Sequence, residues 1–294
     1  MQDLKEDFDS LVAKTPLSDG IDRRDFLMTA LGTGFAAAVL PVAAQSVIKT
    51  DTAGLTAGTV SVTVNGQTVP VYRAQPEGKS NLPVILVVSE IFGVHEHIAD
   101  IARRFAKQGY LALAPDLFVR QGNPASYGSI PELMKEVIAK VPDAQVMADL
   151  DACVAWAKDH GGNTDKLGIT GFCWGGRIVW LYCAHNPDVK AGVAWYGRLV
   201  GEKTALTPTQ PVDIAAGLKV PVLGLYGGKD SGIPLDTVEK MKAELAKGSS
   251  KSEIVVFPNS GHAFNADYRP SYVEADAKAA WQRCLAWFKA HGVA

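Results

Sequence analysis

The segment 167–176 constrains this chain more than any other part of its sequence. An apolar run ends there in a Gly-x-Cys-x-Gly turn centred on Cys173, and a helical pattern follows. A strand, a tight turn and a helix in this order leave no room for a side chain at Gly171 or Gly175, where neighbouring backbone would clash with it. The turn lifts the Cys173 sulfur above the sheet edge and sets it at a helix N-terminus, where the dipole favours the thiolate. The segment therefore predicts a nucleophilic cysteine.

Two further residues complete a constellation in the order nucleophile, acid, histidine. Asp230 follows the apolar run 222–226, and His262 follows the run 253–257. Each therefore lies just past the C-terminal end of a strand, where open α/β sheets place their ligands. The order is typical of α/β-hydrolases, in which the acid orients the histidine and the histidine serves the nucleophile. Asp236 is the nearest alternative acid.

Apolar runs alternate with helical patterns along the chain, which predicts an α/β fold of the α/β-hydrolase type. Residues 59–64 alternate with period two, Asn65-Gly66 forms a turn and residues 69–73 return, so the N-terminal edge of the sheet is antiparallel. The continuous apolar run 83–89 is typical of a strand buried on both faces. We expect a mostly parallel central sheet with helices on both faces. Further strands are predicted at 110–114, 166–170, 189–196, 220–226 and 253–257, and helices at 97–107, 132–139, 143–160, 234–247 and 272–290.

Residues 1–44 resemble a twin-arginine export signal. Arg23-Arg24 precedes an apolar stretch of small residues that ends in a sequence suited to signal peptidase. The alternative is a membrane-anchored or buried helix. We expect the twin-arginine export machinery to deliver the protein to the periplasm or outside the cell, with no stable membrane span after the signal is removed. Residues 45–57 are predicted to be a linker, and residues 58–294 a single catalytic domain.

Composition limits the partners of the chain. Its 294 residues are 47% hydrophobic and carry a formal net charge of −2, so it can bury a large core and has no basic excess to attract nucleic acid. We expect a small-molecule partner, no nucleic acid, no metal and no organic cofactor. His95 and His97 lack the additional cysteine or acid cluster that a metal site needs. The histidines expected to be structural or solvent-facing are His95, His97, His160, His185 and His291.

The four cysteines include no Cys-x-x-Cys pair, so zinc-binding and thioredoxin-like sites are not indicated. Cys153, Cys183 and Cys284 lie in helical patterns among apolar residues, where cysteine packs as a small and inert side chain. Only Cys173 lies in a setting that predicts reactivity.

Five blocks of the sequence resemble the dienelactone hydrolase family, whose members open lactone rings. The blocks are Glu-Ile-Phe-Gly at 90–93, Pro-Asp-Leu-Phe at 115–118, the turn at 171–176, Tyr-Gly-Gly-Lys-Asp at 226–230 and Gly-His-Ala-Phe at 261–264. The resemblance implies that Glu90 lies beside Cys173 and takes part in activating it when substrate arrives. It also implies an oxyanion hole formed by the backbone N–H groups of Ile91 and Trp174, the same pair that the general rule for this fold selects.

One position departs from the family pattern. Family members hold a carboxylate of the substrate with arginines, one of them four residues after the histidine, where this chain has Ala266. The candidates to replace that arginine are Arg269, Arg120, Lys135 and Arg198. Tyr196 is a further candidate pocket residue, and the irregular stretch 117–142 is of the kind that lines or covers a pocket.

Together these features predict a hydrolase that cleaves lactone or ester bonds through a Cys-His-Asp triad and an acyl-enzyme. One alternative is a general carboxylesterase or thioesterase. Two others are a non-catalytic ligand-binding protein on the same fold and a thiol-redox protein that uses Cys173. The complete triad argues against the binding protein, and the lack of a nearby resolving cysteine argues against the redox protein.

Overall fold

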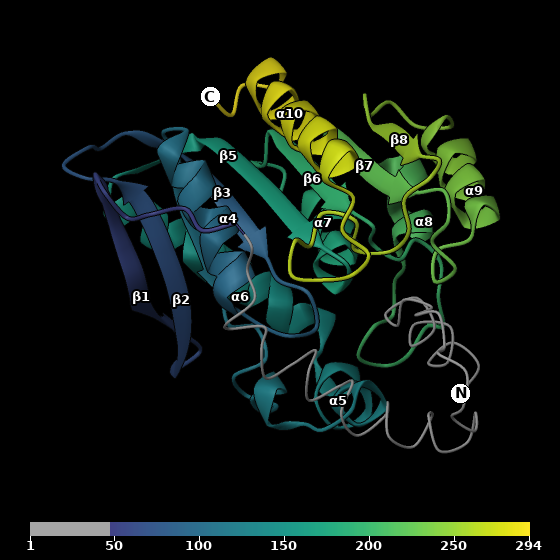
Figure 1. Cartoon of the computed structure of the whole chain (residues 1–294), viewed down its shortest axis with the longest axis horizontal. Helices are drawn as coiled ribbons and strands as arrows, with labels where there is room; N and C mark the ends of the chain where they lie inside the picture. Colours follow the sequence, from purple (N-terminus) through teal and green to yellow (C-terminus); the bar gives the residue numbers. More distant parts are fainter. Residues whose placement is uncertain (1–47) are drawn as a thin grey trace, which may run out of the picture.

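Eight strands form one sheet in the computed structural model, which describes residues 48–294 (Figure 1). Their order across the sheet is β1-β2-β4-β3-β5-β6-β7-β8. β2 runs antiparallel to both β1 and β4, and all other neighbouring strands are parallel. The strands span Leu55–Val64 (β1), Gln67–Pro76 (β2), Leu82–Val88 (β3), Leu111–Pro115 (β4), Gly162–Phe172 (β5), Ala191–Trp195 (β6), Val222–Gly227 (β7) and Glu253–Phe257 (β8). The predicted mostly parallel sheet with an antiparallel N-terminal edge is confirmed.

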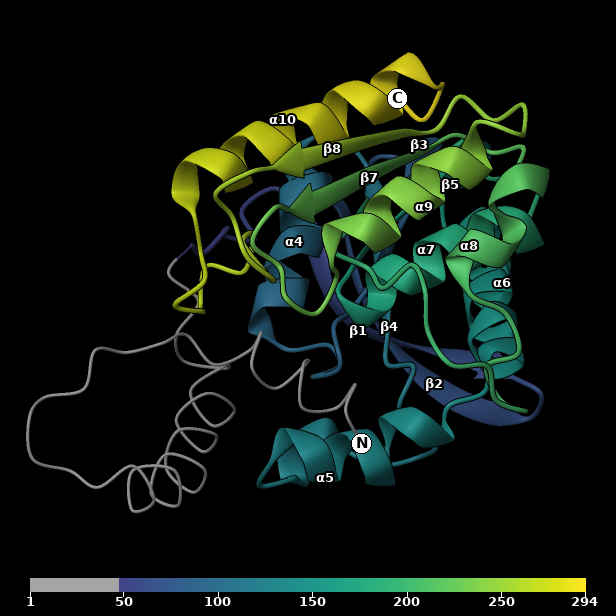
Figure 2. The same cartoon turned by 90° about the vertical axis from the view of Figure 1, so that its right-hand side faces the viewer.

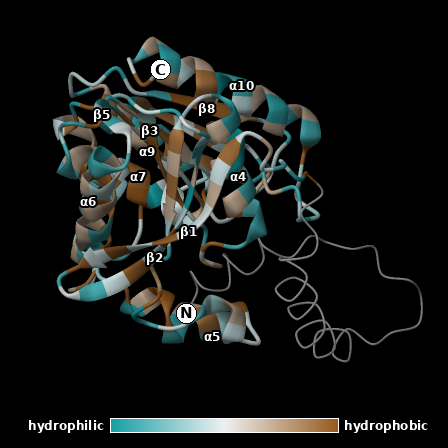
Figure 3. Ribbon diagram, turned by 90° about the vertical axis from the view of Figure 1, so that its left-hand side faces the viewer, coloured by the Kyte–Doolittle hydropathy of each residue, from teal (hydrophilic) through white to brown (hydrophobic). Residues whose placement is uncertain are grey.

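Helices cover both faces of the sheet. α4 and α10 lie over one face, and α6, α7 and α9 lie over the other (Figures 1 and 2). Hydrophobic residues follow the strands at the centre of the molecule (Figure 3), because a strand covered on both faces has no side that meets water. The five residues 84–88 of β3 are accordingly inaccessible to solvent. The helices span Glu96–Lys107 (α4), Ile130–Glu136 (α5), Asp143–Asp159 (α6), Trp174–His185 (α7), Pro211–Ile214 (α8), Leu235–Leu245 (α9) and Glu274–Ala290 (α10).

The domain begins earlier than the sequence predicted. β1 starts at Leu55, inside the stretch 45–57 that was predicted to be a linker. Lys107 also holds this stretch, because its Nζ donates to Asp51 Oδ1 (2.6 Å) and to the carbonyl oxygen of Ala53 (2.7 Å). The first half of β1 is partly exposed, so its residues lack the clear alternation that marks a strand in the sequence.

The predicted export segment, residues 1–44, lies outside the described residues. Within residues 48–294, every helix is too short or too polar to cross a membrane.

Candidate active site

A sharp turn joins β5 to α7 and carries Cys173. Its φ of 54° and ψ of −115° form a conformation that residues other than glycine rarely adopt. Two glycines permit the turn: a Cβ added at Gly171 would lie 2.4 Å from the carbonyl oxygen of Gly175, and one added at Gly175 would lie 2.4 Å from that of Val88. The Cys173 N–H donates to the carbonyl oxygen of Trp195 over 3.0 Å. The nucleophile predicted from the sequence is thus fixed at the N-terminus of α7.

The loops after β7 and β8 bring Asp230 and His262 to this turn. His262 Nδ1 donates to Asp230 Oδ2 over 2.7 Å, and both side chains are buried. The Gly232 N–H donates to the other carboxylate oxygen over 3.0 Å and fixes its orientation. Burial lowers the pKa of His262, but the charge of Asp230 and the sulfur of Cys173 outweigh that effect, so the pKa lies well above its ordinary value. Asp236, the alternative acid, lies in the first turn of α9 instead.

A pocket of about 240 Å³ opens beside Cys173 and His262. The ring of Tyr196, a predicted pocket residue, lines it and meets the His262 ring edge-on, with 5.2 Å between the ring centroids. A second part of the lining is apolar and comes from α5 and the 3₁₀ helix η3 (Ile138–Lys140), which replace the single helix predicted at 132–139. The apolar lining residues are Ile91, Ile130, Met134, Ile138, Ala139, Trp174 and Ile233. The expectation that part of the irregular stretch lines a pocket is confirmed.

Two backbone N–H groups of the pocket are suited to an oxyanion. Trp174 is the first residue of α7, so its N–H has no acceptor within the helix. Ile91 follows Glu90 in the loop after β3 and lines the same pocket. Neither N–H donates to an acceptor within the described part of the chain. Both can therefore bind an oxygen atom of a molecule in the pocket.

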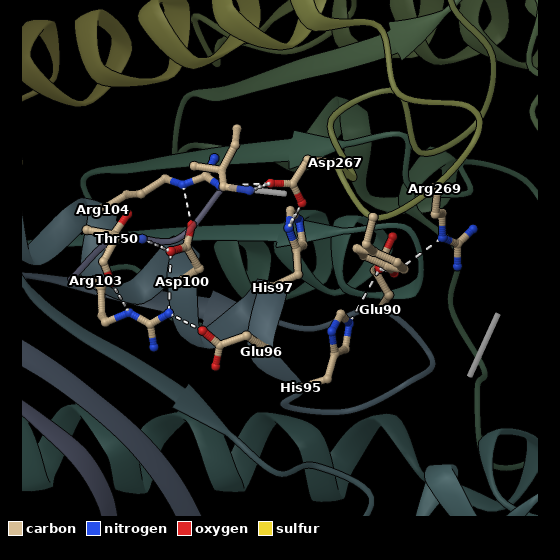
Figure 4. A network of polar contacts seen from close by, with 12 residues as sticks. Thr50, Glu90, His95, Glu96, His97, Asp100, Arg103, Arg104, Asp267 and Arg269 are labelled. Atoms are coloured by element: carbon tan, nitrogen blue, oxygen red, sulfur yellow. Dashed lines mark hydrogen bonds and ion pairs between the residues drawn. The ribbon is translucent and has the colours of Figure 1, made fainter. Parts of the chain in front are cut away.

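Glu90 is buried two residues after the end of β3, and polar side chains surround its carboxylate (Figure 4). The Tyr268 hydroxyl donates to Oε2 of Glu90 and accepts from Arg269 Nε over 3.2 Å. His95 Nε2 lies 3.8 Å from the same carboxylate oxygen. Burial raises the pKa of Glu90, but the charge of Arg269 and the contacts with His95 outweigh it, so the pKa lies well below its ordinary value. Glu90 is thus an anion bonded to Tyr268, and no hydrogen bond among the described residues joins it to Cys173.

Two of the cations predicted to bind a substrate carboxylate lie away from the pocket. Arg120 forms a two-pronged ion pair with the buried Asp149, through bonds of 2.7 and 2.8 Å, and does not line the pocket. The prediction that Arg120 binds substrate is therefore wrong. The sequence could not show that Arg120 would pair with a buried carboxylate on α6. Lys135 is exposed and pairs with Glu136 over 3.3 Å.

The other two cations lie nearer to Cys173. Arg269 stacks on the ring of Phe92, 4.9 Å from its centroid, and donates to Tyr268 beside Glu90 rather than lining the pocket. Arg198 does line the pocket. It is the one predicted cation that the described structure places in the pocket lining.

Three residues near Glu90 were not identified as site residues from the sequence. His97 Nδ1 and Asp267 Oδ1 form a buried pair at 2.9 Å, and Tyr268 follows Asp267 directly. A single histidine on the inner face of a helix is usually structural, and an aspartate and a tyrosine in a loop usually serve turns or packing. The run of three polar residues Asp-Tyr-Arg at 267–269, close after the histidine block, is the only hint that the sequence offers.

Comparison with known proteins identifies the family. The sequence profile of the dienelactone hydrolase family matches residues 69–292. This chain belongs to that family. The resemblance seen in the five sequence blocks is therefore confirmed.

Relatives in the dienelactone hydrolase family match nearly the whole chain. A protein of Methylorubrum extorquens, provisionally named carboxymethylenebutenolidase, is 57% identical over 289 residues, which are 98% of each chain. A protein of Escherichia coli K12 with the same provisional name is 52% identical over 267 residues, 90% of this chain and 98% of its own. A crystal structure from Klebsiella pneumoniae, provisionally described as a dienelactone hydrolase, has 58% identity and a TM-score of 0.79 and covers 80% of this chain and 98% of its own. This member of the dienelactone hydrolase family is thus a hydrolase of ester or lactone bonds on an α/β-hydrolase fold.

Proposed function

We propose that Cys173, His262 and Asp230 act as a catalytic triad that hydrolyses a small-molecule lactone or ester through an acyl-enzyme. The observation that carries the proposal is the convergence of these residues at the pocket. A cysteine on a strained turn faces a histidine whose other ring nitrogen is bonded to a buried aspartate. A backbone conformation of this kind costs about 1–3 kcal/mol and persists where function requires it.

The first half of the reaction forms the acyl-enzyme. The Cys173 thiolate attacks the carbonyl carbon, and the electron pair of the C=O bond moves to the oxygen, where the N–H groups of Ile91 and Trp174 stabilise it. The tetrahedral intermediate then collapses and the bond to the leaving oxygen breaks. The His262 imidazolium gives its Nε2 proton to that oxygen. In a lactone the leaving oxygen stays attached to the acyl chain, so the ring opens without loss of a fragment.

The second half regenerates the enzyme. His262, now neutral and oriented by Asp230, takes a proton from a water molecule that attacks the thioester carbon. The second tetrahedral intermediate breaks at the C–S bond, which releases the carboxylic acid and restores the thiolate beside the imidazolium. Thiolate is a good leaving group, so this chemistry suits activated esters and lactones better than amides. None of these steps calls for a metal or an organic cofactor.

The names of the relatives favour lactones as the substrate class. Several are provisionally named carboxymethylenebutenolidase, and a Bradyrhizobium protein that is 30% identical over 234 residues is provisionally named a lactonase of 2-oxo-3-(5-oxofuran-2-ylidene)propanoate. The pocket lining favours a second candidate, a general carboxylesterase or thioesterase. Its walls are largely apolar, and Arg120 and Arg269, two of the four cations proposed to hold a carboxylate, are engaged by other residues.

Hydrolysis of p-nitrophenyl acetate, together with mass spectrometry of the enzyme, tests the proposal. The natural chain should turn over and carry an acetyl group on Cys173 in the steady state. C173A should be inactive with its fold intact, C173S should keep little activity, and C183A, which alters a buried thiol, should match the natural chain. Hydrolysis by C173A at the natural rate would refute the triad. A panel of lactones and esters would then define the substrate class.

We further propose that the twin-arginine machinery exports the protein to the periplasm or beyond. The Arg23-Arg24 pair before the apolar stretch supports this, since it is the element that such a signal requires. Changing both arginines to lysine should retain the protein in the cytoplasm, whereas K14R in the same segment should not. Unchanged delivery of the double variant to the periplasmic fraction would contradict the proposal.

A further inference from the structure

We infer that the buried pair His97–Asp267 is a positioning element for the reaction: it fixes the loop whose next two residues hold Glu90 at the active site. The inference rests on the proposed hydrolysis by Cys173. Neither residue touches the pocket, so both act through Glu90 and not on substrate.

Asp267 is the point at which three separate parts of the chain meet (Figure 4). Its Oδ1 accepts from His97 Nδ1 on α4 over 2.9 Å. Its Oδ2 accepts from the backbone N–H of Ile48 over 3.1 Å and from Arg104 Nη2 over 3.4 Å. The carboxylate is inaccessible to solvent, and His97 is 1% exposed. A buried carboxylate with this many donors has one favoured orientation, so the backbone at position 267 is fixed as well.

The two residues after Asp267 carry the groups that hold Glu90. The Tyr268 hydroxyl donates to Glu90 Oε2, and Arg269 donates to that hydroxyl and supplies the positive charge that most lowers the pKa of Glu90. Because the three residues are consecutive, a shift of position 267 displaces both side chains. The pair therefore controls where the Glu90 carboxylate lies and whether it is ionised.

A second path links the pair to Glu90 through stacked rings. The His95 and His97 rings are parallel within 19° with their centroids 6.1 Å apart, and Tyr268 packs edge-on against both, at 5.1 and 5.2 Å. His95 Nε2 reaches to 3.8 Å from Glu90. The ring of His97 thus supports two of the side chains that face the carboxylate.

A neighbouring carboxylate anchors the same network to residues 48–50. Asp100 accepts from the Thr50 N–H over 2.5 Å and from Arg104 Nε over 2.6 Å, while Arg103 Nε donates to the carbonyl oxygen of Thr50 over 2.8 Å. Through Arg104 this anchor reaches Asp267. The first described residues of the chain are therefore part of the support beneath Glu90.

The test compares two buried carboxylates, of which only Asp267 belongs to the loop that holds Glu90. H97F removes the bond between Asp267 and His97, and D267N removes the negative charge that strengthens it. D149N breaks a comparably buried ion pair, that with Arg120, which contacts neither the pocket nor Glu90. We expect D267N and H97F to lower kcat for p-nitrophenyl acetate at least tenfold with KM changed less than threefold. D149N should lower the melting temperature but leave kcat within twofold.

The pH profile separates positioning from mere stability. The charged and titratable groups that face Glu90 are Arg269, Tyr268, His95, His97 and Tyr196. When Tyr268 and Arg269 move away, burial dominates and the carboxyl takes up its proton at higher pH. D267N and H97F should therefore show an acidic limb of kcat/KM at a higher pH than any acidic limb of the natural chain, and this limb should vanish when E90Q is added.

A conservative variant checks the role of the bond itself. H97N keeps a side-chain N–H donor near the position of Nδ1, so it should recover activity to within about threefold of the natural chain. If D267N and H97F behave like D149N, with the natural pH profile and kcat, the inference is wrong while hydrolysis by Cys173 stands. If C173A hydrolyses the ester at the natural rate, the proposed function itself fails.

Discussion

Two histidine–aspartate pairs are buried within residues 48–294, and they differ in what the second ring nitrogen contacts. The pair His262–Asp230 is joined at 2.7 Å, and the pair His97–Asp267 at 2.9 Å. His262 faces Cys173 and the pocket, whereas Nε2 of His97 is buried without a partner among the described residues. The bond between imidazole and carboxylate is thus the same device in both places. Whether such a pair can take part in catalysis depends on the access of its histidine to a nucleophile and to water.

The two pairs also differ in how the backbone presents them. His262 precedes Ala263, whose φ of 57° is one of the unusual positive values near the pocket, together with those of Cys173 and Tyr196. His97 lies in the first turns of a regular helix, α4. The strained residues follow the C-terminal ends of strands, where loops are free to carry chemistry. The regular helix α4 carries a residue that supports the site from outside the pocket.

The two pairs should differ most in how much activity is lost when the histidine is replaced. H262A should lower kcat/KM for p-nitrophenyl acetate by at least about a thousandfold, because acylation and deacylation both need its proton transfers. H97F should cost about tenfold, since the reacting groups remain. Steady-state kinetics on folded protein measures both. Equal losses would erase the distinction between a catalytic pair and a supporting one.

The next contrast concerns the aspartate of the catalytic pair. D230N keeps the shape but turns the acceptor into a possible donor, which disfavours the tautomer of His262 that can take a proton at Nε2. We expect kcat to fall by about a hundredfold or more. D236N changes a nearby exposed aspartate and should stay within twofold of the natural chain. A small loss in D230N would mean that another group orients His262.

A contrast of about tenfold is expected between neutral and anionic substrates. The apolar wall of α5 and η3 offers no partner to a carboxylate, and Arg269 is held beside Glu90. Phenyl hexanoate should therefore exceed the phenyl monoester of adipate about tenfold in kcat/KM, or about 1.4 kcal/mol, after the rate with C173A is subtracted. If the adipate ester is the better substrate and R198Q abolishes that preference, Arg198 recognises carboxylates.

The smallest effect lies in the pH dependence of stability. The folded-state pKa of Glu90 is lowered, so its ionised form stabilises the fold above the unfolded value of about 4.3, and this contribution is lost as the pH falls toward the folded-state pKa. The free energy of unfolding should therefore differ most between the natural chain and E90Q at pH 7, and the gap should narrow toward pH 3.5. Urea unfolding at both pH values measures it. A gap that widens in acid would show that Glu90 is not held as an anion.

The parts of the site that the sequence predicted are those encoded over short distances. The turn at Cys173 needs only its own glycines, and Asp230 and His262 each follow a recognisable strand. The parallel sheet then brings the three strand ends to one edge without further information. The backbone donors Ile91 and Trp174 follow from the same rule, and the structure places both in the pocket.

The support beneath Glu90 could not be predicted because it joins distant segments. His97 and Asp267 are 170 residues apart, and Tyr268 and Glu90 are 178 apart. No local sequence pattern at any of these residues indicates which distant residue it will contact. Arg120 is a further case, because the sequence predicted that it binds substrate. It pairs instead with Asp149, 29 residues further along the chain, and only the packing of α6 brings the two side chains together.

Because three of the four thiols are buried, labelling of the remaining thiol can be used to titrate active sites. Cys153, Cys183 and Cys284 lie inside the core, and burial raises the pKa of each, so a soft electrophile added to the folded protein meets Cys173 alone. One equivalent of label should then report the concentration of competent enzyme in any preparation. The buried cysteines would react only when the protein unfolds, so the rate of their labelling measures the rate of unfolding.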